Sequence, residues 1–262
     1  MPKRVSLPKR SRTWSPRDCA NWMKTPWKSC GKSTHSRPPP RESKEDSREI
    51  THEAEECCSV TPVFDHADVL KALRSFPKGT AAGASGFRAQ HLLDAVSDPA
   101  KEETESVLSI LADVCSLLAA GKAPAEIAPW VASAPIYPLN KKGGGIRPIA
   151  VGEVMRRLVS KMLLNSKGMQ EKIDTCLRQV GQFGVRVKSG ADAIIQAVRT
   201  WMTDPLKKNH IALKFDFENA FNSISRTAIR KEVKTHFPEL LPWYDACYDK
   251  PAHLFCQHKM LP

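Results

Sequence analysis

The first 58 residues of the chain contain too few aliphatic side chains to form a core, which restricts folding to the rest. Residues 1–41 hold eleven basic residues and one acidic residue, and residues 42–58 hold two basic and seven acidic residues. A segment with high charge and little apolar surface cannot offset the entropy that it would lose on folding. We therefore predict a disordered tail over residues 1–58 and a folded unit over residues 59–262.

Positive charge gathers in two blocks of the chain. The whole chain carries 40 Lys and Arg residues against 28 Asp and Glu residues, a formal net charge of +12. Beside residues 1–41, residues 141–200 form a second basic block with twelve basic and four acidic residues. Such blocks favour nucleic acid as a partner, because Lys and Arg bind mainly to phosphates. Trp14, Trp22 and Trp27 in the tail could stack on bases, although a solvated tail is the simpler interpretation.

The sequence carries no sign of a membrane span or a secretory signal. No run approaches the roughly 18 consecutive apolar residues that a span needs, and the basic N-terminus lacks an apolar core. The eight cysteines are scattered, and several lie within apolar patterns that suit reduced, packed thiols better than a disulfide framework. We expect an intracellular protein of the nucleus or cytoplasm, with no membrane partner.

Periodicity and turn residues predict a mixed α+β fold for the folded unit. Apolar residues at helical spacing predict helices between Asp65 and Pro77, at about 102–120, at 153–164 and at 191–202. Residues 78–86 are rich in small side chains and predict a loop whose amides could lie against a phosphate chain. Two extended runs flank the glycine-rich segment 140–145 and predict a basic β-hairpin.

One apolar run ends in a carboxylate. Residues 210–215 are typical of a buried strand, and Asp216 follows them directly. Burying a carboxylate is costly unless it faces a cation, and a metal ion suits a carboxylate at the end of a strand. An Asp in this position is also typical of an N-cap for the next helix or turn. The run by itself leaves both roles open.

Four short blocks occur in order along the chain. They are KGTAAGASGF at 78–87, IYPLNKKGGGIRPI at 136–149, QFGVR at 182–186 and LKFDFENAFN at 213–222. Together they resemble the reverse transcriptases of non-long-terminal-repeat, LINE-type retrotransposons, over roughly residues 64–255. Each block alone is weak, but four in order are specific. The resemblance implies the fingers and partial palm of a right-hand polymerase fold, mostly helical with a β-hairpin and a palm strand.

The resemblance implies RNA-templated DNA synthesis, in which two Mg²⁺ ions promote phosphoryl transfer. Its partners would be an RNA template, a DNA primer and deoxynucleotides. Asp216 would be the catalytic metal ligand, and Phe217 would offer its backbone carbonyl to one ion. Phe221 would pack on the sugar and exclude a 2′-hydroxyl, although an ordinary core aromatic is the simpler interpretation of this residue.

Two basic elements would then contact phosphates. Arg147 and one of Lys141 and Lys142 would neutralise the incoming triphosphate, since a planar guanidinium binds phosphate oxygens in pairs. Solvated turn lysines are the simpler alternative for the hairpin. The block at 181–190 resembles the element that touches the template, which implies template contacts for Gln182, Arg186 and Lys188, the last two on phosphates.

The sequence departs from this family after Asp216. Such polymerases carry a later Tyr/Phe-x-Asp-Asp hairpin and then a thumb, and the printed sequence contains neither. We therefore expect a fragment with an incomplete metal site that is inactive alone. Two other interpretations stay open. One is a non-catalytic nucleic-acid-binding remnant, and the other is a group II intron maturase-like protein, because the 182–186 block is shared with those proteins.

Overall fold

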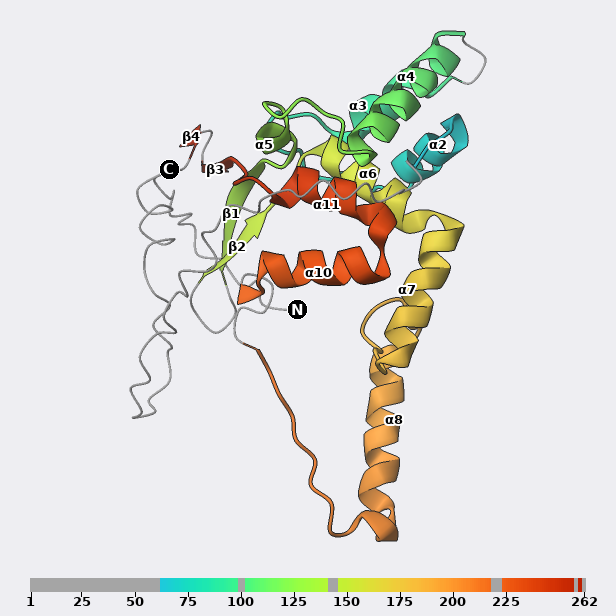
Figure 1. Ribbon diagram of the computed structural model, residues 1–262, viewed down its shortest axis with the longest axis vertical. Helices are drawn as coiled ribbons and strands as arrows, with labels where there is room; N and C mark the ends of the chain where they lie inside the picture. Colours follow the sequence, from blue (N-terminus) through green and yellow to red (C-terminus); the bar gives the residue numbers. More distant parts are fainter. Residues whose placement is uncertain (1–61, 99–101, 141–145, 218–222, 257–258, 261–262) are drawn as a thin grey trace, which may run out of the picture.

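The computed structural model describes residues 62–98, 102–140, 146–217, 223–256 and 259–260 (Figure 1). These residues form a mixed α+β fold that is mostly helical, as the sequence predicts. The helices are α2 (His66–Arg74), α3 (Ala89–Ala95), α4 (Glu102–Ala119), α5 (Ala128–Val131), α6 (Val154–Asn165), α7 (Lys167–Gln179), α8 (Gly190–Thr203), α10 (Arg226–His236) and α11 (Leu241–Tyr248), with 3-10 turns η1 (Pro205–Lys207) and η2 (Pro238–Leu240). The strands are β1 (Ala134–Asn140), β2 (Ile146–Ala150), β3 (Leu254–Cys256) and β4 (Lys259–Met260). The predicted tail lies outside the described residues.

Capping residues fix the ends of the first helices. Asp65 accepts a hydrogen bond from the amide of Asp68 at 2.8 Å, and the Asp68 carboxylate accepts from the amide of Asp65 at 3.4 Å. This reciprocal capping box starts α2 where the sequence predicts a helix. At the end of α4, Gly121 has a φ of +69°, a left-handed conformation that glycine adopts without steric cost.

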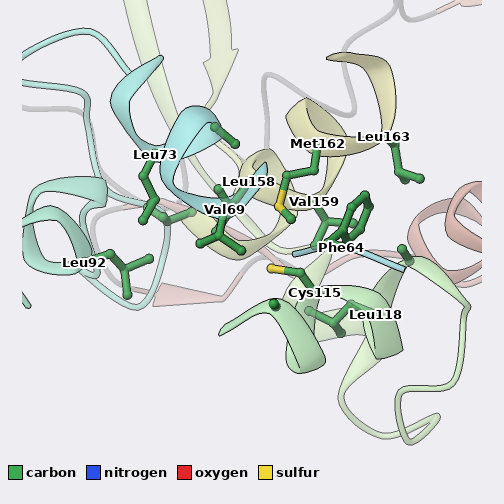
Figure 2. Close-up of a cluster of buried hydrophobic side chains, with 14 of the residues drawn as sticks. Phe64, Val69, Leu73, Leu92, Cys115, Leu118, Leu158, Val159, Met162 and Leu163 are labelled. Atoms are coloured by element: carbon green, nitrogen blue, oxygen red, sulfur yellow. The ribbon is translucent and has the colours of Figure 1, made fainter. Parts of the chain in front are cut away.

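Helices α2, α4 and α6 pack their apolar faces together to form the core (Figure 2). Val69, Leu73, Cys115, Leu158 and Val159 are fully buried at the centre. Burial of each such side chain stabilises the fold by about 1.5–3 kcal/mol. These residues come from the three periodic segments that the sequence predicts to be helical, and their packing confirms those predictions.

Helix α11, from the C-terminal part of the chain, packs against this core. Trp243 is 6% exposed, and its indole N–H donates to Oγ of Ser160 on α6 at 3.0 Å. The buried indole therefore keeps a hydrogen-bond partner, as a buried polar group requires. This contact places α11 beside the helix that follows the hairpin.

The strands form one sheet in the order β2-β1-β3-β4. β1 and β2 form the predicted antiparallel hairpin, with pairs running from Ile136↔Ala150 to Asn140↔Ile146. β3 pairs parallel with β1, and β4 pairs antiparallel with β3. β3 and β4 have three and two residues, and runs this short carry too little alternation to be predicted from sequence.

Helices α7 and α8 extend away from the core (Figure 1). The sequence predicts α8, but its apolar side chains are largely exposed: Ile194 is 46% exposed, Val198 46% and Met202 72%. Helix α7 was not predicted. Met169, Ile173 and Leu177 recur at helical spacing within it, which is the signal that would have indicated it.

The predicted buried strand at 210–215 is wrong. These residues have no regular secondary structure, and Ile211, Leu213 and Phe215 are 83%, 75% and 75% exposed. A strand forms only where a neighbouring strand pairs with its backbone groups. β1 is paired on both sides, and no strand in the described part of the chain pairs with this run.

Three of the four cysteines that the structure describes follow the expectation of reduced thiols. Cys115, Cys176 and Cys247 are free, and burial raises the pKa of Cys115 to about 12 and that of Cys247 to about 11. Cys256 takes part in a disulfide, so the expectation is wrong for this residue. The high pKa values make the two buried thiols packing groups rather than nucleophiles.

Candidate nucleic-acid interface

The hairpin presents Arg147 on the outer strand of the sheet. Arg147 pairs with Leu139 across the ladder, and its side chain is exposed. β2 lies at the edge of the sheet, next to the glycine-rich segment 141–145. Lys141 and Lys142 lie outside the described residues, so Arg147 is the one predicted triphosphate contact that can be placed.

Asp216 lies on an exposed extended segment. Asp216 is exposed, and the neighbouring Phe217 is 78% exposed. Phe221 lies outside the described residues. The next helix that the structure describes, α10, is capped by Ser225, whose Oγ accepts from the amide of Ala228 at 3.3 Å. Asp216 is therefore not the N-cap of α10.

The described residues do not fit a two-ion magnesium site. Among them, no group of three or more His, Cys, Asp or Glu side chains is placed to hold a metal ion. Two Mg²⁺ ions need several fixed oxygen ligands, because magnesium otherwise keeps its waters. Asp216 supplies one carboxylate, which is fewer than the fixed oxygen ligands that two ions need.

The three predicted template residues gather around one pocket of about 370 Å³, the α7 loop pocket, which α7 and the loop after it form. Its lining consists of Asp174, Leu177, Arg178, Gly181, Gln182, Phe183, Val185, Arg186, Val187 and Lys188. Gln182 accepts a hydrogen bond from the amide of Gly184, which shapes the turn. The structure therefore brings Gln182, Arg186 and Lys188 together.

Arg186 is paired within this pocket. Its Nε and Nη2 donate to the two Asp174 carboxylate oxygens at 2.7 and 3.4 Å. The hydrogen bond from Arg186 lowers the pKa of Asp174 below its ordinary value. A template phosphate would compete with Asp174 for this guanidinium, while Arg178 and Lys188 add positive charge to the same lining.

A second basic pocket, which sequence reasoning missed, lies along α6. This α6 pocket has a volume of about 440 Å³ and is lined by Ala150, Gly152, Arg156, Arg157, Ser160, Lys161 and Tyr248. Three of the seven residues are cations and none is acidic. The pairs 156/160 and 157/161 are four residues apart and share one helix face. That spacing, opposite the apolar face of α6, is the signal that would have found the pocket.

The small-residue loop at 78–86 already holds an anionic group of the protein. The amide and hydroxyl of Ser85 donate to the Glu153 carboxylate at 2.8 and 2.7 Å. A Cβ on Gly83 would lie 2.5 Å from Cδ of Glu153, so only glycine fits there. The Ser85 amide, one of those expected to face a phosphate chain, therefore binds a carboxylate.

Comparison with known proteins does not identify the chain. No protein-family model matches it, and no curated protein matches it. Among the residues that the structure describes, every helix is too short or too polar to cross a lipid bilayer.

Proposed function

We propose that the chain is part of a LINE-type reverse transcriptase, comprising the fingers and the opening of the palm. In this role it binds an RNA template and a DNA primer and holds the triphosphate of a deoxynucleotide. The observation that carries the proposal is the exposed Arg147 on the outer strand of a hairpin whose tip sequence is rich in glycine and lysine. The order of the four sequence blocks supports the same function.

The chemistry of Arg147 suits this role. A guanidinium presents several N–H donors in a fixed plane and binds phosphate oxygens in pairs. The backbone pairing of β1 and β2 over five residue pairs holds the strand that carries it. A rigid strand with an exposed guanidinium therefore provides a fixed contact for a triphosphate.

A nucleic-acid-binding role without chemistry is the second candidate. It is favoured by the basic residues around the α6 pocket and the α7 loop pocket, because basic residues need no metal ion to bind phosphates. Both candidates predict binding of nucleic acid. They differ in whether a deoxynucleotide takes part.

The test is the binding of a fluorescently labelled RNA–DNA template–primer to the full chain, measured by anisotropy with Mg²⁺ and deoxynucleotides. For the polymerase fragment, we expect the nucleotide complementary to the next template base to tighten the complex several-fold. A non-complementary nucleotide should have no effect. Arg147→Gln should abolish the nucleotide effect while changing the affinity for the template–primer alone by less than about threefold, because Arg147 contacts the triphosphate of the nucleotide and not the template–primer.

The matched control is Arg74→Gln, which removes an exposed arginine from α2, outside both pockets and the hairpin. This variant should keep the nucleotide effect. A wild-type complex that ignores every deoxynucleotide would contradict the polymerase proposal, and binding of the template–primer under those conditions would support the second candidate.

A further inference from the structure

We propose that the α6 pocket binds backbone phosphates of a single-stranded polynucleotide. The inference rests on the proposed function only for the identity of the polymer. The phosphate chemistry follows from the charges, the unpaired donor and the aromatic wall of the pocket itself.

The three cations of the pocket are held by neutral groups. Arg156 Nη1 donates to the carbonyl of Ala132 at 2.9 Å, Arg157 Nη2 to that of Ala81 at 2.6 Å, and Lys161 Nζ to Oγ of Ser75 at 3.1 Å. Within the described residues, none of the three forms a salt bridge. These contacts fix the positions of the cations and leave their charges without a bound anion.

The Glu153 carboxylate, which acts on Arg157, is engaged by the 78–86 loop. This carboxylate attracts the guanidinium of Arg157, but both of its oxygens accept hydrogen bonds from Ser85. Desolvation of the guanidinium outweighs this attraction and lowers the pKa of Arg157. An anion in the pocket would favour the charged form of Arg157.

Arg157 also carries a donor with no partner. Its Nε atom is buried and makes no hydrogen bond within the described residues. A buried N–H without an acceptor costs about 1–3 kcal/mol. A small adjustment of the side chain would let this N–H donate to a phosphate oxygen. Binding of an anion with several acceptor oxygens would therefore remove the cost of the unpaired donor.

The Tyr248 ring forms one wall of the pocket and favours a polynucleotide over inorganic phosphate. The ring of Tyr248 stacks on Tyr244 with centroids 4.9 Å apart, and the guanidiniums of Arg156 and Arg226 lie 5.0 and 5.9 Å from its centroid. Tyr248 is 41% exposed. Single-stranded nucleic acids bind where aromatic rings adjoin a basic groove, because bases stack while phosphates contact cations.

The volume of the pocket fits more than a solvent molecule. One water takes up about 30 Å³ of the liquid, and the pocket offers about 440 Å³. A phosphate with its attached sugar can therefore enter, and the strand can continue along the exposed side of α6.

The test is the binding of a labelled single-stranded oligouridylate to the full chain across a range of salt concentrations. We expect the double variant Arg156→Gln/Lys161→Gln to bind at least about tenfold more weakly, because hydrogen bonds to charged groups are lost. The slope of log affinity against log salt should fall by about 0.7 for each phosphate contact removed. The control Lys122→Gln/Lys208→Gln removes the same charge from exposed sites outside the pocket and should stay within about threefold of wild type.

Thermal melting, a single variant and a competition experiment complete the test. If thermal melting shows that the double variant does not fold, the single Lys161→Gln variant is used, with an expected loss of about fivefold. Competition with free deoxynucleotide separates the two sources of phosphate, because the polymer should compete at far lower concentration than the nucleotide. Equal competition by free nucleotide, or equal losses in pocket and control variants, would overturn the inference.

This outcome is independent of the Arg147 experiment. If the pocket variants bind oligouridylate more weakly and deoxynucleotides have no effect on the template–primer complex, the α6 pocket proposal stands and the polymerase proposal is contradicted. If deoxynucleotides tighten the complex and the pocket variants bind oligouridylate as the wild type does, the polymerase proposal stands and the α6 pocket proposal is contradicted.

Discussion

Arg230 and Asp245 join helix α10 to helix α11 through two parallel hydrogen bonds. Nε of Arg230 lies 2.8 Å from Oδ1 of Asp245, and Nη2 lies 2.9 Å from Oδ2. The two side chains are 27% and 23% exposed, so water screens the pair only in part. Asp245 is one of the few acidic residues after Asp216, and its two oxygens are engaged by Arg230. It therefore has a structural role in α11.

Removing either partner of this ion pair should lower stability. We expect Arg230→Gln or Asp245→Asn to reduce the free energy of unfolding by about 1–3 kcal/mol, since each leaves a half-buried charge without its partner. The double variant should lose less than the sum of the two single changes. Urea denaturation measures all three. Glu232→Gln, which breaks the exposed contact between Glu232 and His236, serves as control and should change stability by less than about 0.5 kcal/mol. If the loss in the double variant equals the sum of the losses in the two single variants, the two residues do not stabilise the fold as a pair.

The buried thiols should make the fold less stable at alkaline pH. Burial raises the pKa of Cys115 to about 12 and that of Cys247 to about 11, whereas both thiols titrate near 9.0 when unfolded. Above pH 9 the unfolded chain releases protons that the folded chain keeps, so stability falls as the pH rises toward 11. Stability measured by denaturation from pH 8 to 11 should show this decline. Cys115→Ala should make it shallower, and Cys176→Ser should leave it unchanged.

Any side chain at position 83 should destabilise the fold, because the 78–86 loop packs closely against Glu153 at the start of α6. A Cβ at Gly83 would lie 2.5 Å from Cδ and 2.7 Å from Cα of Glu153. Gly83→Ala should therefore cost about 1–3 kcal/mol, as overpacking does. The control is Gly168→Ala in helix α7, where a Cβ meets nothing within 4 Å, and this change should stabilise the chain by about 0.5–1 kcal/mol. Thermal denaturation that ranks the two variants in the opposite order would contradict the loop contact.

Local signals in the sequence predicted much of the fold. Asp65 marks the start of α2, the apolar spacing of 102–120 and 153–164 marks two core helices, and the glycines at 143–145 mark the hairpin. Each of these depends on neighbours in sequence, such as a cap or a period. The run at 210–215 carries the same kind of signal, but its state depends on a strand partner, which its own residues cannot reveal.

The candidate site was less predictable than the fold. Short stretches of sequence were enough to predict that Arg147 lies on the hairpin and that Gln182, Arg186 and Lys188 lie close together. The structure describes the positions of all four residues. The Arg186–Asp174 pair and the wall that Tyr248 adds to the α6 pocket join residues distant in sequence. Contacts of this kind depend on how helices pack, so a single sequence indicates the charges without their partners.

The most direct test of the central claim is the salt dependence of template–primer binding by the full chain and by Arg147→Gln. If phosphate contacts hold the nucleic acid, log affinity should fall linearly with log salt between about 50 and 200 mM, with a slope of several units. Without nucleotide, Arg147→Gln should show the same slope as the wild type, because Arg147 contacts the nucleotide and not the duplex. With the complementary deoxynucleotide present, the variant should bind several-fold more weakly than the wild type, because it lacks the contact with the triphosphate. A wild-type affinity that stays constant over this range, or a variant that keeps the full nucleotide effect, would contradict the account.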